Sequence, residues 1–212
     1  MHPYDKTYFD YQKIAGNLGG QINLTKFTRF IKPTDTVLDF GCGGGYLLKN
    51  LPCKRKLGVE INPVARATCV ENGLREVHEN FQPIAANSVD LVISNHALEH
   101  VEEPVSILRE IHRVLRPGGK VVLYLPYDDY RNAKSYDPKN VNFHLYTWNI
   151  QLIGNCLDRA GFKNIQPRIY SHAWPKHYNF CFKHLPRPIF DFICRLTSIR
   201  KRRRQVMAVA EK

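Results

Sequence analysis

The 212-residue sequence has no apolar run long enough to cross a membrane and no closely paired cysteines. A membrane-spanning helix needs about 20 consecutive apolar residues, and no stretch approaches that length. The residues after Met1 lack the apolar core of a secretory signal. The six cysteines are scattered without a C-x-x-C pair, which favours free thiols in a reducing cytosol over disulfides or zinc ligands. These absences predict a cytoplasmic protein.

Acidic residues are the other shortage, because 19 Asp and Glu stand against 31 Lys and Arg, for a net charge of +12. The excess is concentrated: residues 175–204 hold nine basic residues and one aspartate, so this segment alone carries +8. Hydrophobic residues make up 43% of the chain, which is a globular composition. The length suits one α/β domain, and the basic segment needs an explanation of its own.

The most distinctive stretch is residues 37–48, where an apolar run enters the loop Gly41-Cys42-Gly43-Gly44-Gly45 and then a second apolar run. A strand that breaks into glycines and reopens as a helix is how an open α/β sheet builds a nucleotide site. The glycines let a ligand approach the backbone, whose N–H groups can bind an anion.

Two residues beside this loop indicate which cofactor it takes. The dinucleotide pattern has Gly or Ala at the sixth loop position, where this chain has Tyr46. Asp39 stands just before the loop, where its charge would repel a pyrophosphate and attract a cationic ligand. S-adenosylmethionine carries an ammonium and a sulfonium, and its carboxylate can use the loop N–H groups. The loop therefore favours S-adenosylmethionine.

Strand and helix patterns alternate along the chain, which predicts an α/β fold with a doubly wound, mostly parallel sheet. The expected strands are residues 37–40, 57–60, 76–79, 88–94, 120–125, 162–170 and 205–210. The expected helices are residues 46–51, 63–72, 97–115 and 148–160, with one or two short helices in 4–30. We expect a single domain, 1–212, with a lid or packing cap (1–30), a cofactor-binding core (31–170), a basic insertion (171–204) and a last strand (205–211).

Glu60 ends the second expected strand, 19 residues after Gly41. A carboxylate at about this distance can accept both ribose hydroxyls of an adenosine, since it offers two oxygens. The loop 80–87, after the third expected strand, is expected beside the adenine.

Five ordered motifs resemble those of the class I S-adenosylmethionine-dependent methyltransferases, especially the small-molecule branch. They are VLDFGCGGG (37–45), GVE (58–60), SVDLV (88–92), NHALEHV (95–101) and LRPGGK (115–120). The resemblance covers about residues 31–170. It implies a Rossmann-like, seven-stranded sheet whose last strand is antiparallel and lies between the fifth and sixth. It also implies a set of cofactor contacts: Asp39, Gly41 and Gly43 at the methionine moiety, Glu60 at the ribose, Glu79, Asn80 or Phe81 at the adenine, and Ser94 or Asn95 near the sulfonium. Cys42 and Ile61 are further candidates for cofactor binding.

Methyl transfer from a sulfonium is an in-line displacement, so the protein mainly positions donor and acceptor and excludes water. A hydroxyl acceptor also benefits from a base, and an imidazole titrates near neutral pH. The candidates are His96, His100 and His144, of which His144 is favoured. His96 and His100 are expected on one helical face, but no third ligand is evident, so no metal is expected.

The acceptor is expected to be a small molecule, at a hydroxyl of a sugar, lipid-linked or secondary-metabolite compound. The sequence after the fourth expected strand, residues 94–97, lacks the Asn-Pro-Pro-aromatic signature of amino-base methylation, so a nucleic acid is not expected. Tyrosines in residues 127–136, and Tyr8 or Tyr11 in a lid, are candidates for touching ligand. The alternatives are an RNA or protein methyltransferase, favoured by the basic segment, and a non-catalytic cofactor-binding scaffold.

Apolar residues recur at helical spacing in residues 188–199, directly before the basic run 200–204. Their positions are 189, 192, 193, 196 and 199. Such a stripe can pack on the domain or on a second subunit of a homo-oligomer. It can also lie on an anionic membrane surface, which would make the protein peripheral to a membrane. Nucleic-acid contact is the third reading.

Overall fold

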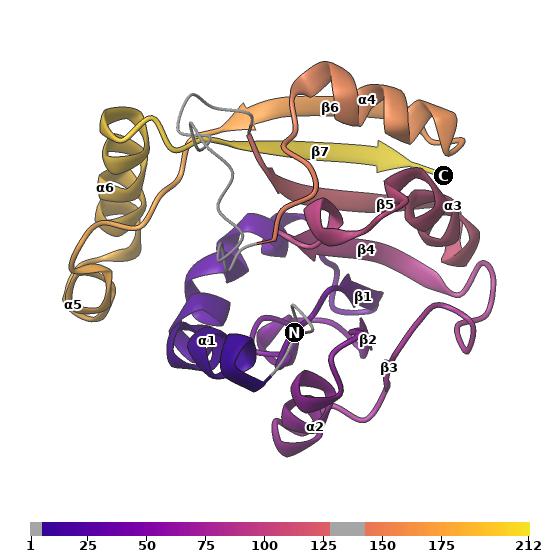
Figure 1. Ribbon diagram of the computed structural model, residues 1–212, viewed down its shortest axis with the longest axis horizontal. Coiled ribbons are helices and arrows are strands. Elements are labelled where there is room, and N and C mark those ends of the chain that lie inside the picture. The colour runs from indigo at the N-terminus through magenta and orange to yellow at the C-terminus, as the bar shows by residue number, and fades with distance from the viewer. Residues whose placement is uncertain (1–5, 128–142) are drawn as a thin grey trace.

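The computed structural model describes residues 6–127 and 143–212, with side chains from residue 16 onward. One seven-stranded sheet, in the order β3-β2-β1-β4-β5-β7-β6, forms its centre (Figure 1). Strands β1 to β5 pair in parallel, whereas β7 runs antiparallel to both β5 and β6. The expected sheet, with an antiparallel seventh strand between the fifth and sixth, is confirmed. The strands are β1 (Thr36–Phe40), β2 (Arg55–Val59), β3 (Val77–His78), β4 (Val89–Asn95), β5 (Leu115–Pro126), β6 (Lys163–Tyr170) and β7 (Gln205–Glu211).

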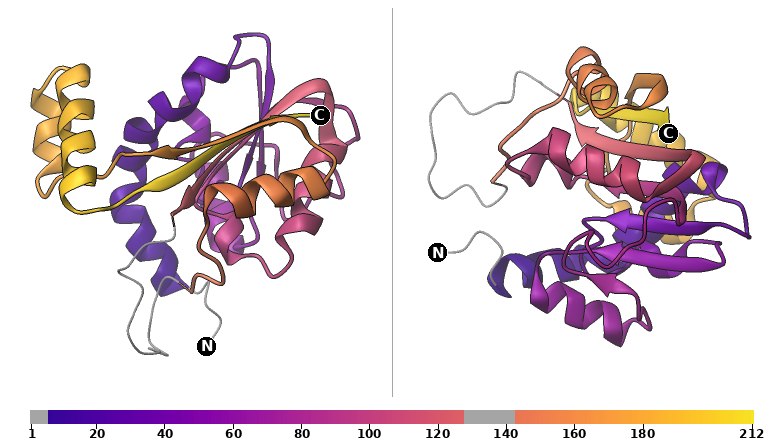
Figure 2. Two further views of the ribbon diagram at one scale, coloured as in Figure 1. Left: turned by 90° about the horizontal axis from the view of Figure 1, so that it is seen from above. Right: turned by 90° about the vertical axis from the view of Figure 1, so that its right-hand side faces the viewer.

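Helices cover both faces of the sheet (Figure 2). Alternate residues of a strand point to opposite faces, so the fully buried β1 supplies two cores. Leu38 belongs to the core cluster that contains Leu108 and Leu157, whereas Val37 belongs to the cluster that contains Phe27. The helices are α1 (Lys6–Phe27), α2 (Pro63–Glu71), α3 (Pro104–Val114), α4 (Ile150–Arg159), α5 (Tyr178–His184) and α6 (Arg187–Arg200).

The N-terminal segment forms one 22-residue helix, α1, instead of the short helices expected. Pro3 and Pro33 lie on either side of this helix and no proline interrupts it. Gly20 lets α1 approach the chain closely, since a Cβ there would lie 2.3 Å from the Tyr46 carbonyl oxygen. α1 therefore packs directly over the segment that follows the glycine loop.

The expected helix over residues 46–51 is wrong. A single 3-10 turn, η2 (Leu48–Asn50), follows the glycine loop. Pro52 stops the segment before an α-helix has the length to be stable, and α1 presses on Tyr46 from outside. The loop therefore lacks the α-helix N-terminus that its sequence predicts.

The expected helix over residues 97–115 is divided into a 3-10 turn, η3 (Leu98–His100), and α3, which begins at Pro104. Proline suits the first turn of a helix and disfavours helical conformation in the residue before it. His96 has a φ of +57° just after β4. The helical face expected for His96 and His100 is therefore wrong.

The basic insertion contains α5 and α6, which project beyond the sheet (Figures 1 and 2). α6 buries Phe190, Cys194 and Ser198, and the first two share a cluster with Ile22 of α1. The expected apolar stripe lies on the opposite face, where residues 189, 192, 196 and 199 are 48–60% exposed. This stripe does not pack on its own domain. Among the residues described, no helix has the length and apolarity to cross a membrane.

Candidate active site

The glycine loop lies where the carboxyl ends of β1, β2 and β4 meet, the edge at which open α/β sheets bind ligands. The Gly41 N–H donates a hydrogen bond to the Val59 carbonyl oxygen at 2.8 Å, which ties the loop to β2. Gly41 has a φ of +72°, and a Cβ on it would lie 2.3 Å from the Ala97 Cβ. Both the backbone conformation and the space therefore require glycine here.

Glu60 directly follows β2 and reaches back to the glycine loop. One carboxylate oxygen accepts a hydrogen bond from the Gly43 N–H at 2.8 Å, and the other accepts one from the Asn62 N–H at 2.9 Å. A carboxylate has about four lone-pair positions, so Glu60 retains capacity for hydroxyl donors. Ile61, its neighbour, is 64% exposed and offers an apolar surface beside this carboxylate.

Asp39 and Cys42 are both buried at the loop. Burial, together with the negative charge of Glu60, raises the pKa of Asp39 well above its ordinary value. A cationic ligand group beside Asp39 would favour the ionised carboxylate and offset that effect. A hydrogen bond with Cys69, together with burial, raises the pKa of the Cys42 thiol, so Cys42 is a packed thiol rather than a reactive thiolate.

The three residues expected beside the adenine have different surroundings. Glu79 and Asn80 are exposed, and Glu79 pairs with Arg66 at 3.3 Å. Phe81 is buried and stacks on Phe40, with ring centroids 5.6 Å apart. The Phe81 ring therefore belongs to the core in this structure.

The last two residues of β4 take different partners. Ser94 is fully buried, and its hydroxyl donates to the Phe40 carbonyl oxygen at 2.9 Å, which ties β4 to β1. Asn95 accepts a hydrogen bond through Oδ1 from Lys26 Nζ at 2.8 Å. Ser94 therefore serves the sheet in this structure, whereas Asn95 is held from α1.

Lys26 is a residue of this edge that the sequence analysis missed, because nothing around it forms a motif. Its side chain is buried, and burial lowers its pKa to about 7. Besides Asn95, Nζ bonds Gln205 Oε1 at 3.0 Å and lies 4.9 Å from the centroid of the Tyr124 ring. The amine is therefore divided between its charged and neutral forms near neutral pH.

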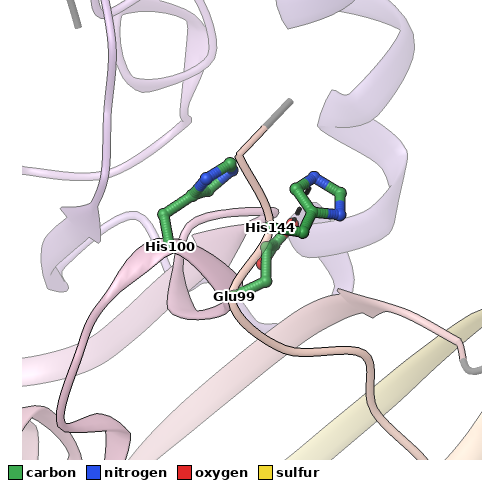
Figure 3. A group of neighbouring side chains, drawn as sticks. All are labelled: Glu99, His100 and His144. Atoms are coloured by element: carbon green, nitrogen blue, oxygen red, sulfur yellow. Dashed lines mark ion pairs between the residues drawn. The ribbon is translucent and has the colours of Figure 1, made fainter. Parts of the chain in front are cut away.

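The structure brings all three candidate histidines to one buried carboxylate, Glu99 (Figure 3 shows two of them). His96 Nδ1 lies 3.1 Å from Glu99 Oε1, and His144 Nε2 lies 4.0 Å from the same oxygen. The His100 and His144 rings meet edge to face, with centroids 4.9 Å apart. The Leu145 N–H donates to the Glu99 carbonyl oxygen at 2.9 Å, which fixes this distant segment against η3.

The charges in this cluster follow from its burial. Burial opposes ionisation of Glu99, but the hydrogen bond from His96 and the nearby imidazoles outweigh it and lower the Glu99 pKa. Burial lowers the pKa of His144 against the attraction of Glu99. At neutral pH the cluster therefore combines a carboxylate anion with a neutral His144 imidazole.

Glu99, His100 and His144 can also hold a metal ion. Each offers one ligand atom, and these atoms all lie within 4.8 Å of one another. Glu99 Oε2 is buried with no hydrogen-bond partner in the described part of the chain. The sequence argument against a metal assumed that no third ligand exists, and the fold corrects that premise by bringing His144 to Glu99.

Several aromatic candidates lie outside what the structure describes. The side chains of Tyr8 and Tyr11 belong to the part of α1 that is not described, and residues 128–142 contain the other tyrosines of the 127–136 group. Tyr127 is described and forms an isolated parallel bridge with Trp148. This bridge places residues 143–148 beside the end of β5.

Residues 38–123, which carry the glycine loop, Glu60 and His96, match the model of the methyltransferase domain family. This match shows a methyltransferase domain in residues 38–123, in agreement with the resemblance to the class I S-adenosylmethionine-dependent methyltransferases. The cofactor of this family, S-adenosylmethionine, is the one that Asp39 and the loop predict.

Curated proteins similar to this chain include ubiquinone biosynthesis O-methyltransferases. That of Ruegeria pomeroyi is 34% identical over 113 residues, which are 47% of this chain and 43% of the relative. That of Xanthomonas axonopodis is 34% identical over 101 residues, 41% of each sequence. The similar region spans less than half the length of these relatives.

Solved structures share the fold of the methyltransferase over its whole length. The S-adenosylmethionine-dependent methyltransferase of Archaeoglobus fulgidus has a TM-score of 0.65 at 16% identity, covering 98% of this chain and 100% of that one. Phosphoethanolamine N-methyltransferase 2 of Haemonchus contortus, in complex with S-adenosyl-L-methionine, has a TM-score of 0.66 at 18% identity, covering 100% of this chain and 58% of that one. Identities this low show the shared fold alone.

Proposed function

We propose that this methyltransferase transfers the methyl group of S-adenosylmethionine to a hydroxyl of a small-molecule acceptor, of the sugar, lipid-linked or secondary-metabolite class. The observation that carries the proposal is the contact between His96 and the buried Glu99, 3.1 Å apart, directly after β4. A sulfonium is already an activated leaving group, whereas a hydroxyl must also lose its proton. The His96–Glu99 pair supplies an acceptor for that proton.

The cofactor in this proposal lies along the glycine loop. Glu60 accepts the ribose hydroxyls, and the exposed Ile61 packs against the adenosine. Asp39 stabilises the cationic methionine end, and the positive φ of Gly41 and Gly43 leaves the loop backbone open to close approach of the ligand. Support comes from the bond between Gly43 and Glu60, since it holds the Glu60 carboxylate at the glycine loop.

The distances to Glu99 favour His96 as the base over His144, which the sequence alone favoured. A carboxylate that accepts a hydrogen bond from Nδ1 leaves the lone pair on Nε2, where it can take a proton. The same carboxylate stabilises the imidazolium that forms once the proton has moved. His144 is the second candidate, and His100 positions it by ring contact.

Two features support a small hydroxyl acceptor. Curated relatives over the matched region are named as O-methyltransferases of ubiquinone biosynthesis. The polar groups that converge beyond β4 are imidazoles and a carboxylate, which suit deprotonation of one hydroxyl. A macromolecular acceptor is favoured by the basic segment, and a scaffold without activity is the remaining alternative.

Calorimetry with S-adenosylmethionine and S-adenosylhomocysteine tests the cofactor half of the proposal. Incubation with methyl-labelled cofactor and a cell extract, followed by product mass, tests the acceptor half. A labelled small molecule with one added O-methyl group supports the proposal. Label in RNA or protein contradicts it in favour of a macromolecular acceptor, and cofactor binding without any labelled product favours the scaffold.

A further inference from the structure

The outer face of α5 and α6 is apolar, and no described residue covers it. We call Ile189, Phe192, Leu196 and Ile199 the α6 stripe; their exposed fractions are 48%, 60%, 50% and 53%. Phe180 lies on α5, the helix that precedes α6 in the chain, and is 64% exposed. Large apolar side chains grouped in this way mark a surface that another body covers.

The charges around the α6 stripe have one sign. Arg195, Arg200 and residues 201–204 are exposed and basic. The acid of this segment, Asp191, is engaged by Arg187 at 3.0 Å and by His172 at 3.6 Å. The surface therefore joins an apolar stripe to a cluster of exposed positive charge.

The stripe stands at the ligand edge of the sheet. β6 ends and β7 begins at this edge, where Tyr170 and Pro126 both pair with Gln205. Arg187 fixes α6 to α1 through a hydrogen bond to the Ile22 carbonyl oxygen at 2.6 Å. Lys26, further along α1, bonds both Gln205 and Asn95. A body that covers the stripe therefore lies on the side from which an acceptor enters.

We propose that the α6 stripe and the basic run 200–204 dock onto an anionic membrane surface. An amphipathic helix with basic flanks lies in the interface with its apolar face among the acyl chains, while Lys and Arg meet the anionic headgroups. A lipophilic acceptor would then reach the site from the bilayer, a consequence that rests on the proposed function. The docking itself does not depend on it.

Other occupants fit the observations less well. A second copy would bring two chains of net charge +12 together, which repulsion opposes. Nucleic acid would meet the arginines and Phe192, but the other stripe residues, Ile189, Leu196 and Ile199, offer no aromatic ring on which a base stacks. An anionic bilayer uses both the stripe and the charge.

Co-sedimentation of the whole chain with two kinds of vesicle tests the proposal. One kind is phosphatidylcholine alone, and the other contains about 30% of the anionic lipid phosphatidylglycerol. One variant combines Phe192→Glu with Leu196→Glu, and a second replaces residues 200–204 by Gln. Val70→Glu on α2 is the control, because Val70 is 67% exposed and lies outside α5 and α6. Thermal melts verify that all variants fold, and calorimetry with S-adenosylmethionine is run on each.

We expect the wild type and Val70→Glu to bind anionic vesicles about tenfold or more better than neutral ones, and less in high salt. Both α6 variants should lose about tenfold or more of this binding while they keep cofactor binding. The proposal is overturned by no vesicle binding at low salt, or by equal binding to neutral vesicles. A dimer in sedimentation velocity that the double variant dissociates, or RNA binding without vesicle binding, also overturns it. If the wild type does not bind S-adenosylmethionine, the result would instead contradict the proposed function.

Discussion

The cofactor side and the outer side of the ligand edge are held by contacts that differ greatly in their separation along the sequence. On the cofactor side, Gly43 bonds Glu60 across 17 residues. On the outer side, Lys26 bonds Gln205 across 179 residues, and Arg187 bonds Ile22 across 165. The first side is built within one stretch of strand, loop and strand, whereas the second needs both ends of the chain.

This difference in sequence separation suits the two sides to different ligands. A site built from neighbouring strand ends presents fixed backbone groups, which suits one constant cofactor. A side assembled from α1, α6 and β7 can change without disturbing those groups, and it is the side from which the proposed acceptor enters. A substitution on either side should therefore impair its own ligand and spare the other.

The largest effect is expected where the two sides meet, at His96. His96→Ala should lower kcat by about 10²- to 10⁴-fold, because the acceptor proton loses its base. The affinity for S-adenosylmethionine, measured by calorimetry, should stay within about twofold of the wild type, since the role proposed for the ring is to accept a proton and not to hold the cofactor. His144→Ala is the comparison and should lose less. If His144→Ala loses more activity than His96→Ala, the base is His144.

Gly41→Ala should damage the cofactor side through its backbone. The new methyl group would collide with Ala97, and the residue would keep a φ of +72°, so the free energy of unfolding should fall by about 3 kcal/mol. Gly73→Ala is a matched control, with a φ of +81° but no atom within 4 Å of the added Cβ. Its loss should be about 1 kcal/mol. If urea denaturation gives equal losses of unfolding free energy for Gly41→Ala and Gly73→Ala, the contact with Ala97 does not contribute to the loss.

The residues of the cofactor side lie close together in the sequence, which explains why this side could be predicted from the sequence. The β1 run, Asp39, the glycine loop and Glu60 lie in one stretch, and their spacing carries the geometry. The parallel sheet also follows from local patterns, and the antiparallel seventh strand follows from the family resemblance. Even here the helix expected over residues 46–51 is wrong, because the contact from Gly20 of α1 comes from outside the motif.

The outer side could not be predicted for the same physical reason. Nothing local distinguishes Lys26 from other lysines until α1 places it against Asn95 and Gln205. Periodicity found the apolar stripe of α6 but not the direction it faces, because Phe190 and Cys194 form a second apolar face that packs on α1. The histidine cluster also needs the fold, since residue 144 reaches Glu99 and His100 of η3 only in the folded chain.

Glu60→Ala should weaken cofactor binding, both by removing the proposed ribose contacts and by releasing the Gly43 and Asn62 N–H groups that Glu60 holds. Two hydroxyl hydrogen bonds to a charged group disappear, so the dissociation constant of S-adenosylmethionine should rise about 10- to 100-fold. Glu79→Ala is the control, because Glu79 is an exposed acid paired with Arg66, and it should change the constant by less than about threefold. Calorimetry on both variants measures this. A larger effect from Glu79→Ala would move an adenosine contact to Glu79.

The smallest expected effect tests the outer side through the pH dependence of stability. Burial holds the pKa of Lys26 at about 7 in the folded chain, whereas a lysine in an unfolded chain titrates near 10.4. Between these values the unfolded state binds more protons, so this lysine makes the free energy of unfolding rise with pH. Relative to Lys26→Met, the wild type should gain about 1.6 kcal/mol between pH 7 and 8.5.

Denaturation curves at several pH values measure that difference. The test is the slope of the free energy of unfolding against pH, not a constant difference between the two proteins. Lys26→Met also removes hydrogen bonds to Asn95 and Gln205, but that loss shifts the whole curve without tilting it. Buried thiols and tyrosines with raised pKa, such as Cys194 at about 12, tilt both proteins alike and cancel in the comparison. The exposed Lys54 gives the control, since Lys54→Met should run parallel to the wild type. Parallel curves for Lys26→Met as well would mean that the amine stays charged in the folded protein, and that α1 holds Asn95 by an ordinary ammonium.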